Sequence, residues 1–285
     1  MASLTACLRQ LPSQNLKLPI SPSHQFAFMK LLTERVAAAN SLLCVGLDPT
    51  GADEATVAGR LREVIRQTAP FAAAFKPNLA FFLARPGGVG MLQQVRELIP
   101  RDIPLILDGK FGDIANTAER YADFAYKVIG ADGVTVNPYM GEDAILPFAR
   151  PGKLVFVLAK TSNQPAFSLQ DEALMRGGSL NERAAAVVRA LDEAHGGSLG
   201  LVVGATQPAA MTTMRRHCPQ QWFLVPGIGA QGGDLAATLQ AGLRPDGAGL
   251  LINASRSLWQ AADAGAAAEQ LQTQINAQRP TLISA

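Results

Sequence analysis

Short apolar runs recur along the whole chain, and a segment with helical spacing follows most of them. The runs are continuous rather than alternating, which is the pattern of strands buried on both faces. After the first run, for example, Val57, Leu61 and Val64 recur at intervals of four and three residues. Strands that alternate with helices are joined by right-handed crossovers and form a parallel sheet. The eight predicted strands span residues 42–47, 72–76, 103–107, 133–137, 154–159, 199–204, 222–225 and 247–252.

Eight strand–helix units in about 240 residues match the usual size of a closed (β/α)8 TIM barrel. A doubly wound open sheet is the alternative, but it would more often carry a GxGxxG turn after its first strand. Residues 46–49 read Gly-Leu-Asp-Pro instead. No Pro- or Ser-rich linker divides the chain, so we expect residues 26–285 to form one barrel domain. The one long connection, residues 160–180, is expected to be a mobile lid or a disordered insert.

Residues 1–25 differ in composition from the rest of the chain. They contain no Asp or Glu, and Arg9 and Lys17 are their basic residues. We interpret this segment as an N-terminal extension without fixed structure. A transit peptide is the alternative, although arginine is scarcer here than in such peptides.

Composition excludes several classes of function. The net charge is +2 and Lys and Arg are not clustered, so no nucleic-acid partner is expected. No apolar run approaches the roughly 20 residues that span a bilayer, so no membrane partner is expected. The three cysteines lie far apart, without CxxC or Cys/His metal spacing. This usage predicts no metal site and is typical of a reducing compartment, which for this chain we take to be the cytoplasm.

Polar residues follow several of the predicted strands directly. In a barrel, the carboxyl ends of the strands meet at one rim, where active sites lie. Charged groups that close apolar strands are costly unless they are paired, so their concentration at this rim predicts a functional site. The residues concerned are Asp48, Lys76, Asp108, Asn137, Lys160, Thr206 and Arg256.

The densest cluster of charges follows the third predicted strand. If the extended chain continues past the strand, Asp108 and Lys110 point the same way. Asp113 and Thr117, four residues apart, would share a face of the next helix. Lys76 leaves the neighbouring strand, and its charge completes an alternating set that can be buried because it cancels. A surface ion pair beside a helix start is the alternative, but it does not explain Lys76 after Ala-Ala-Ala-Phe.

A second cluster follows the seventh and eighth predicted strands. Residues 226–234 are rich in glycine, which lets backbone N–H groups close around an anion, and Asp234 is placed to cap the next helix. Arg256 follows the last strand and offers a planar fork of donors. Barrels commonly bind phosphate with these two loops, so we predict a phosphate site, although the glycines alone could form a simple turn.

These motifs, in this order, resemble the orotidine 5′-phosphate decarboxylase family, in its subgroup of longer bacterial chains. The run Asp-x-Lys-x-x-Asp-Ile-x-x-Thr from Asp108 to Thr117 carries the resemblance most specifically. It extends from about Phe28 to the C-terminal helix. Leu83 departs from the pattern, which has an acidic residue there. The other matching segments are residues 75–78, 80–82, 135–139, 203–206, 226–234 and 255–257.

The resemblance implies a lyase of pyrimidine biosynthesis that converts orotidine 5′-phosphate to UMP without a metal or cofactor. Lys110 would protonate C6 of the pyrimidine as carbon dioxide leaves, and Asp108 would lie beside the substrate carboxylate. Lys76 would hold a ribose hydroxyl. Asp113 and Thr117 would reach into the partner's site of a homodimer.

The resemblance also implies four substrate contacts away from the reacting carbon. Asp48 would hold a ribose hydroxyl, and Ser162, on the long connection, would contact the pyrimidine. Gln231 and Arg256 would bind the phosphate.

Two other functions share parts of this pattern. Sugar-phosphate decarboxylases and aldolases have the same Asp-x-Lys-x-x-Asp run but use Mg²⁺. Lys76, and the lack of a further acidic residue at the end of the second strand, argue against them. A non-catalytic nucleotide-binding barrel is the other alternative. It would have little reason to keep a buried charge array, which is expensive to maintain.

Overall fold

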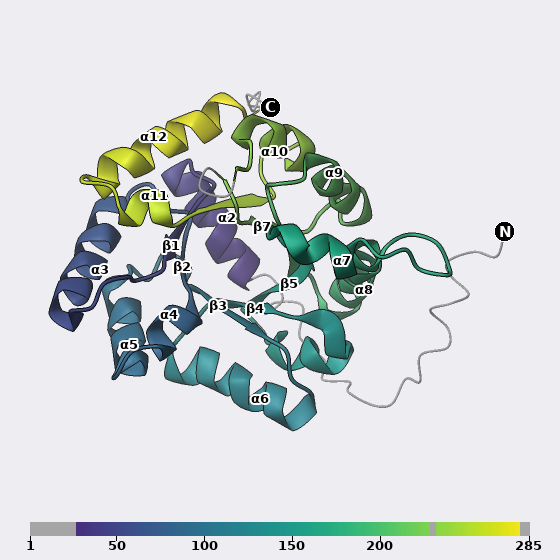
Figure 1. Ribbon diagram of the computed structural model, residues 1–285, viewed down its shortest axis with the longest axis horizontal. Helices are drawn as coiled ribbons and strands as arrows, with labels where there is room; N and C mark the ends of the chain where they lie inside the picture. Colours follow the sequence, from purple (N-terminus) through teal and green to yellow (C-terminus); the bar gives the residue numbers. More distant parts are fainter. Residues whose placement is uncertain (1–26, 229–231, 280–285) are drawn as a thin grey trace.

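Eight parallel strands form a ring in the computed structural model, which describes residues 27–228 and 232–279 (Figure 1). The strand order is β2-β1-β8-β7-β6-β5-β4-β3. Contacts between β2 and β3 close the ring: the N–H of Phe75 donates to the carbonyl of Pro104 at 2.9 Å, and Asn78 forms a bridge with Asp108. The predicted (β/α)8 barrel is confirmed. The strands are β1 Leu43–Leu47, β2 Ala74–Pro77, β3 Ile106–Phe111, β4 Gly133–Val136, β5 Leu154–Lys160, β6 Leu199–Val203, β7 Phe223–Val225 and β8 Leu250–Ala254.

Helices cover the outside of the ring, as the amphipathic spacing predicts. On α3, the side chains that face the barrel are the apolar ones at helical spacing, and Asp53 caps its first turn by accepting from the N–H of Thr56. The main helices are α3 Glu54–Thr68, α4 Leu79–Leu83, α5 Gly88–Leu98, α6 Ala115–Asp123, α8 Leu180–His195, α9 Pro208–His217, α10 Leu235–Gly242, α11 Arg256–Trp259 and α12 Ala264–Ala277.

One further helix, α2 (Ala27–Ala39), lies across the middle of the ring in Figure 1. Its Leu32 and Val36 are buried. Its Arg35 donates to the carbonyls of Ala69 and Ala72, which precede β2. The helix therefore covers the end of the barrel where the strands begin and leaves the opposite rim open.

Every strand differs by at least one residue from its predicted bounds, and the third and the eighth differ most. The third begins at Ile106 rather than at residue 103, and it runs on through Asp108 and Lys110, which the sequence pattern placed beyond it. The eighth begins at Leu250, because Gly247 and Gly249 both have positive φ and form a turn before it. We expected polar residues to mark the end of each strand, whereas both of these strands continue through them.

The sequence prediction for residues 1–25 lies outside the described residues. Within the part of the chain that the structure describes, no helix has both the length and the apolar character needed to cross a membrane.

Close packing between β1 and the end of β8 requires a glycine. A methyl group on Gly46 would lie 2.7 Å from Cβ of Ser255. We predict that Gly46→Ala lowers the free energy of unfolding by about 1–3 kcal/mol, the usual cost of overpacking. Urea denaturation measures this.

Gly59→Ala is the matched control, because Gly59 lies inside α3 and a methyl group there meets nothing within 4 Å. It should raise stability by roughly 0.5–1 kcal/mol, as alanine is the better helix former. Equal effects of the two substitutions would contradict the close approach of β1 and Ser255.

Candidate active site

A cavity of about 350 Å³ opens at the rim where the strands end. Its walls come from loops and strand ends around most of the ring, including β1, β2, β3, β5, β7 and β8. Six of the predicted site residues line it together: Asp48, Lys76, Asp108, Lys110, Ser162 and Arg256.

A second hollow, of about 470 Å³, lies beside this cavity, between the loop after β1 and helix α4. None of the predicted site residues lines it. Its Arg85 is engaged with the carbonyls of Pro49 and Gly51, so it serves to hold that loop. The chemistry of the 350 Å³ cavity makes it the candidate active site.

The centre of the cavity is a chain of three charges. Asp108 accepts from Nζ of Lys76 through Oδ2 and from Nζ of Lys110 through Oδ1, both at 2.6 Å. The side chains of Lys76 and Asp108 are only 5% and 8% exposed, whereas that of Lys110 is 47% exposed. Lys110 is therefore the member of the chain that offers its ammonium group to the cavity.

The pKa values show that the buried pair stays charged. Burial alone would raise the pKa of Asp108, but the ammonium groups of Lys76 and Lys110 outweigh it and hold that pKa below its usual range. Burial would lower the pKa of Lys76, yet the carboxylates of Asp108 and Asp48 raise it.

These pKa shifts define the pH range over which the pair stabilises the fold. The contribution of Asp108 is fully present above the ordinary aspartate pKa of about 3.9 and is lost as the pH falls through the lower pKa of the folded state. The contribution of Lys76 is present below the ordinary lysine pKa of about 10.4 and is lost as the pH rises through its higher value. The pair is thus intact across the whole neutral range.

A bulge in β3 brings Asp108 and Lys110 together. Leu107 pairs with Val134 and Phe111 with Val136, so the register shifts between these two pairs. Lys110 has a φ of +45°, in the left-handed region. The two side chains come together, but the extended geometry from which we expected them to point the same way is wrong.

Asp48 lies at the end of β1 with one oxygen engaged and one without a partner. Its Oδ2 accepts from the hydroxyl of Ser255 at 2.6 Å. Its Oδ1 is buried and accepts no hydrogen bond from the described residues, and the same holds for Oδ1 of Asn253. Both residues line the cavity, so these two oxygen atoms can accept hydrogen bonds from hydroxyl groups of a ligand.

Sequence reasoning missed Asn253 and Ser255. Asn253 lies in β8 and Ser255 follows it. Side chains two residues apart on a strand point to the same face, so a strand predicted to continue to Ala254 would have placed both residues on the side of the cavity. The predicted end at residue 252 excluded them.

The long connection after β5 has defined structure, so a disordered insert is wrong. It contains the short helix α7 (Phe167–Gln170) and a bridge between Ala173 and Ser179. Gln170 accepts from the N–H of Thr161 at 2.8 Å. This contact folds the connection back on itself at the point where Ser162 enters the cavity.

Lys160 anchors the same connection rather than lining the cavity. It is fully buried, and its ammonium group lies 2.6 Å from both carboxylate oxygens of Asp171. Asn181 of α8 donates to Asp171 as well, at 2.7 Å. Gly204 lets the anchored chain pass closely over β6, since a methyl group there would lie 2.7 Å from Cα of Ser162.

The loops after β7 and β8 form one side of the cavity. Asp234 caps α10 by accepting from the N–H of Ala237, as predicted. Arg256 begins the short helix α11 and lines the cavity. Arg60 of α3 donates to the carbonyls of Trp259 and Ala261 and so holds the other end of that helix. Gln231, the other predicted phosphate ligand, lies outside the described residues.

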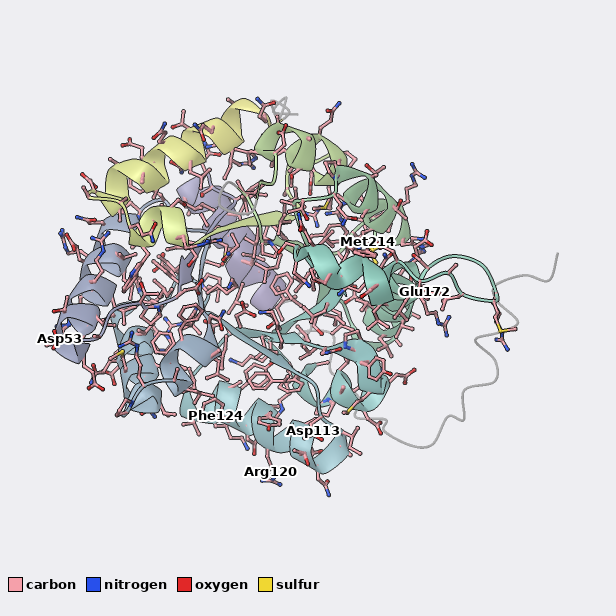
Figure 2. All side chains as sticks on the ribbon, viewed as in Figure 1. Asp53, Asp113, Arg120, Phe124, Glu172 and Met214 are labelled. Atoms are coloured by element: carbon pink, nitrogen blue, oxygen red, sulfur yellow. The ribbon has the colours of Figure 1, made fainter. Side chains whose placement is uncertain are left out.

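Asp113 and Thr117 do not line the cavity of their own chain. Asp113 precedes α6, which begins at Ala115, and Figure 2 shows it at the start of that helix. The predicted shared helix face is therefore wrong. Thr117 is exposed, and Asp113 forms no ion pair among the described residues. The chain extends after Gly112 before it turns into the helix, and this carries Asp113 away from Lys110.

Residues 27–228 and 232–279 contain no group of three or more His, Cys, Asp or Glu side chains arranged to hold a metal ion. The charges of the cavity pair with one another instead.

Removing Asp171 tests the anchor of the long connection. Asp171→Ala leaves the ammonium group of Lys160 buried without its carboxylate, so we predict a loss of about 3 kcal/mol in the free energy of unfolding. The N–H of Thr161 should also exchange faster with solvent, because its acceptor on the connection is released. Urea denaturation and amide hydrogen exchange measure the two effects.

Asp102→Ala is the control, since Asp102 also pairs with a basic side chain, that of Arg35, but is 67% exposed, whereas Asp171 is 39% exposed and its partner Lys160 only 1%. It should cost less than about 1 kcal/mol. An Asp171 variant no less stable than this control would show that the ion pair with the buried Lys160 does not hold the connection.

Comparisons with known proteins give one consistent result. Residues 41–271 match the family described as orotidine 5′-phosphate decarboxylase / HUMPS family. The orotidine 5′-phosphate decarboxylase of Thermomicrobium roseum is 42% identical over 81% of this chain and 86% of its own length, and that of an Azoarcus species is 42% identical over 88% and 99%. The structure of the Leishmania donovani OMP decarboxylase is similar with a TM-score of 0.83, 46% identity and coverage of 89% of this chain and 99% of that one.

Proposed function

The chain belongs to the orotidine 5′-phosphate decarboxylase / HUMPS family, and from this premise we propose how its residues perform the family's reaction. The enzyme decarboxylates orotidine 5′-phosphate (OMP) to UMP, in pyrimidine biosynthesis. The observation that carries our assignment of roles is the chain of charges from Lys76 through Asp108 to Lys110 at the cavity wall.

The difficulty of the reaction lies at one carbon. When the bond from C6 to the carboxylate breaks, its electron pair stays on C6, and no adjacent carbonyl group delocalises it. A fixed ammonium group beside C6 stabilises this charge as it develops. Lys110 is placed for that role, and its ammonium group then gives C6 a proton and regains one from water. A barrier reduction in the upper part of the range of about 8–23 kcal/mol is required, so one lysine cannot act alone.

Asp108 contributes by its fixed charge. Because two ammonium groups keep it ionised, it presents a negative charge to the substrate carboxylate, and the repulsion is relieved when carbon dioxide leaves. Lys76 holds Asp108 from the buried side and offers a donor to the ribose. Neither role requires a metal ion or a cofactor.

The remaining contacts bind parts of the substrate that do not react. The unpartnered oxygen of Asp48 suits a ribose hydroxyl, and Ser162 on the anchored connection suits the pyrimidine. We assign the phosphate to Arg256 and Gln231. Binding energy from the phosphate can close the site around the reacting end and so raise kcat as well as lower KM.

We propose that the enzyme is a homodimer in which Asp113 and Thr117 complete the partner's site. Three large apolar side chains lie exposed on the loops after β3 and β4: Ile114, Tyr139 and Met140. These loops are adjacent, since the N–H of Asn137 donates to the carbonyl of Phe111 at 2.7 Å. A second copy that covers this surface would bury them and would bring its Asp113 to the rim.

The proposal also includes one catalytic domain over residues 26–285 and a location in the cytoplasm. The buried Cys44 and Cys218 are free thiols, as expected of a reducing compartment.

The reaction is tested by the fall in ultraviolet absorbance as OMP is converted to UMP. Wild-type enzyme should turn over equally with and without a chelator. Lys110→Ala should lose turnover by several orders of magnitude while its urea denaturation stays close to wild type, because both the proton donor and the stabilising charge are gone.

Lys30→Ala, which removes an exposed lysine on α2, is the control and should be fully active. Retention of more than a small fraction of activity by Lys110→Ala would refute its role. Turnover that the chelator abolishes would favour the magnesium-dependent relatives instead.

The shared site is tested by mixing two inactive variants, Lys110→Ala and Asp113→Asn. In a mixed dimer, one site carries both defects and the other carries neither, if Asp113 acts across the interface. Random pairing makes half of the dimers mixed, so about a quarter of all sites should be intact in a closed two-fold dimer. Activity should recover to about that fraction of wild type. No recovery, after subunit exchange has been demonstrated, would show that each site is complete within one chain.

A further inference from the structure

The bulge in β3 leaves one residue of β4 opposite three residues of β3. Val134 pairs with Leu107 and Val136 with Phe111, so Thr135 alone faces the segment from Asp108 to Lys110. Regular ladder hydrogen bonds cannot form across such a mismatch. Buried backbone groups must nevertheless find partners, so another group has to replace the missing ones.

The hydroxyl group of Thr135 takes this place. It accepts from the backbone N–H of Lys110 at 2.9 Å and donates to Oδ1 of Asp108 at 2.8 Å. A hydroxyl group has one proton to donate and lone pairs to accept with, so both bonds can form at once. Thr135 is 1% exposed, so water does not compete for either bond.

The direction of these bonds is fixed by the charge of Asp108. An ionised carboxylate can only accept, and the low pKa of Asp108 keeps it ionised. The hydroxyl proton must therefore point to Asp108, which leaves a lone pair of the oxygen for the N–H of Lys110. The same Oδ1 also accepts from Nζ of Lys110 at 2.6 Å, so the three groups form a closed ring.

Lys110 needs this support more than a residue in a regular strand would. Its φ of +45° lies in a region that is costly for side chains other than glycine, and such backbone persists only where its surroundings hold it. Its side chain is half exposed, so packing around the side chain does little to fix it. The bond from its N–H to Thr135 is a direct restraint on the strained backbone.

We propose that Thr135 is a positioning residue that sets where the ammonium group of Lys110 and the carboxylate of Asp108 stand relative to the reacting carbon. Thr135 lines the cavity, but with only 1% of its surface exposed it acts through these two residues and not on the substrate. The inference rests on the proposed roles of Lys110 and Asp108. The strand pattern alone does not indicate this role, because Thr135 lies in the buried run Gly-Val-Thr-Val, where threonine is an ordinary strand former.

Two substitutions separate the hydroxyl group from the shape of the side chain. Thr135→Val keeps the shape and removes the hydroxyl, whereas Thr135→Ser keeps the hydroxyl and removes a methyl group. With OMP as substrate, Thr135→Val should lower kcat by about 100-fold, the loss that a displacement of about 1 Å can cause. Its KM should change by less than about threefold, because the proposal leaves the ribose and phosphate contacts intact. Thr135→Ser should keep kcat within about fivefold of wild type.

Thr68→Val is the matched control. Thr68 is also fully buried and donates its hydroxyl, to the carbonyl of Val64 at 2.7 Å, but it lies in α3, outside the cavity. Its loss should affect urea denaturation but leave kcat unchanged. If Thr135→Val does not fold, Thr135→Cys replaces it, and its weaker donor should give a kcat between those of the Ser variant and a full loss.

Three results would overturn the proposal: a Thr135→Val enzyme with the kcat of wild type, a Thr135→Ser enzyme as impaired as Thr135→Val, or a loss of kcat in Thr68→Val equal to that in Thr135→Val. If Thr135→Cys has to be used, a kcat equal to that of wild type overturns it likewise. Wild-type enzyme that fails to decarboxylate OMP would instead refute the proposed function.

Discussion

A carboxylate buried between two ammonium groups is the interaction on which this site depends. Asp108 alone would be too costly to ionise out of water, and Lys76 alone would lose its proton there. Each makes the other's charge tolerable, and the pKa values of both move toward the charged form. Lys110 then adds a second positive charge that is open to the cavity. Removal of Lys76 or Asp108 leaves its partner's charge uncompensated or less compensated in a buried place, so these two residues form a single unit in energy as well as in position.

The barrel positions the charged residues of the site. Parallel strands end at one rim, so Lys76 and Asp108 on neighbouring strands meet there without any contribution from flexible loops. The bulge in β3 then turns Lys110 back over Asp108, at the expense of a strained backbone. Strain of this kind collects at functional sites, where the surrounding structure holds it in place. On the opposite side, the ion pair between the buried Lys160 and Asp171 fixes the connection that carries Ser162.

Much of the fold could be predicted because it depends on local patterns. Apolar runs alternating with helical spacing specify the barrel, and polar residues after those runs locate the rim. What could not be predicted depends on pairing between distant segments. The bulge forms because one residue of β4 lies opposite three residues of β3, and the spacing of residues along either strand does not predict this pairing. Asp113 was predicted to lie on a helix, because four-residue spacing cannot show where a helix begins. Lys160 was predicted to lie at the rim, because the sequence does not show that the chain brings Asp171 back to pair with it.

Infrared difference spectroscopy of the Asp108 carboxyl group tests the central claim most directly. The wild-type spectrum is compared with that of Asp108→Asn as the pH is lowered from about 8 to about 4, the ordinary pKa of an aspartate. The two lysines predict that Asp108 contributes only carboxylate bands over this whole range. A protonated carboxyl band assigned to Asp108 at any pH within it would contradict the claim that the ammonium groups overcome the effect of burial.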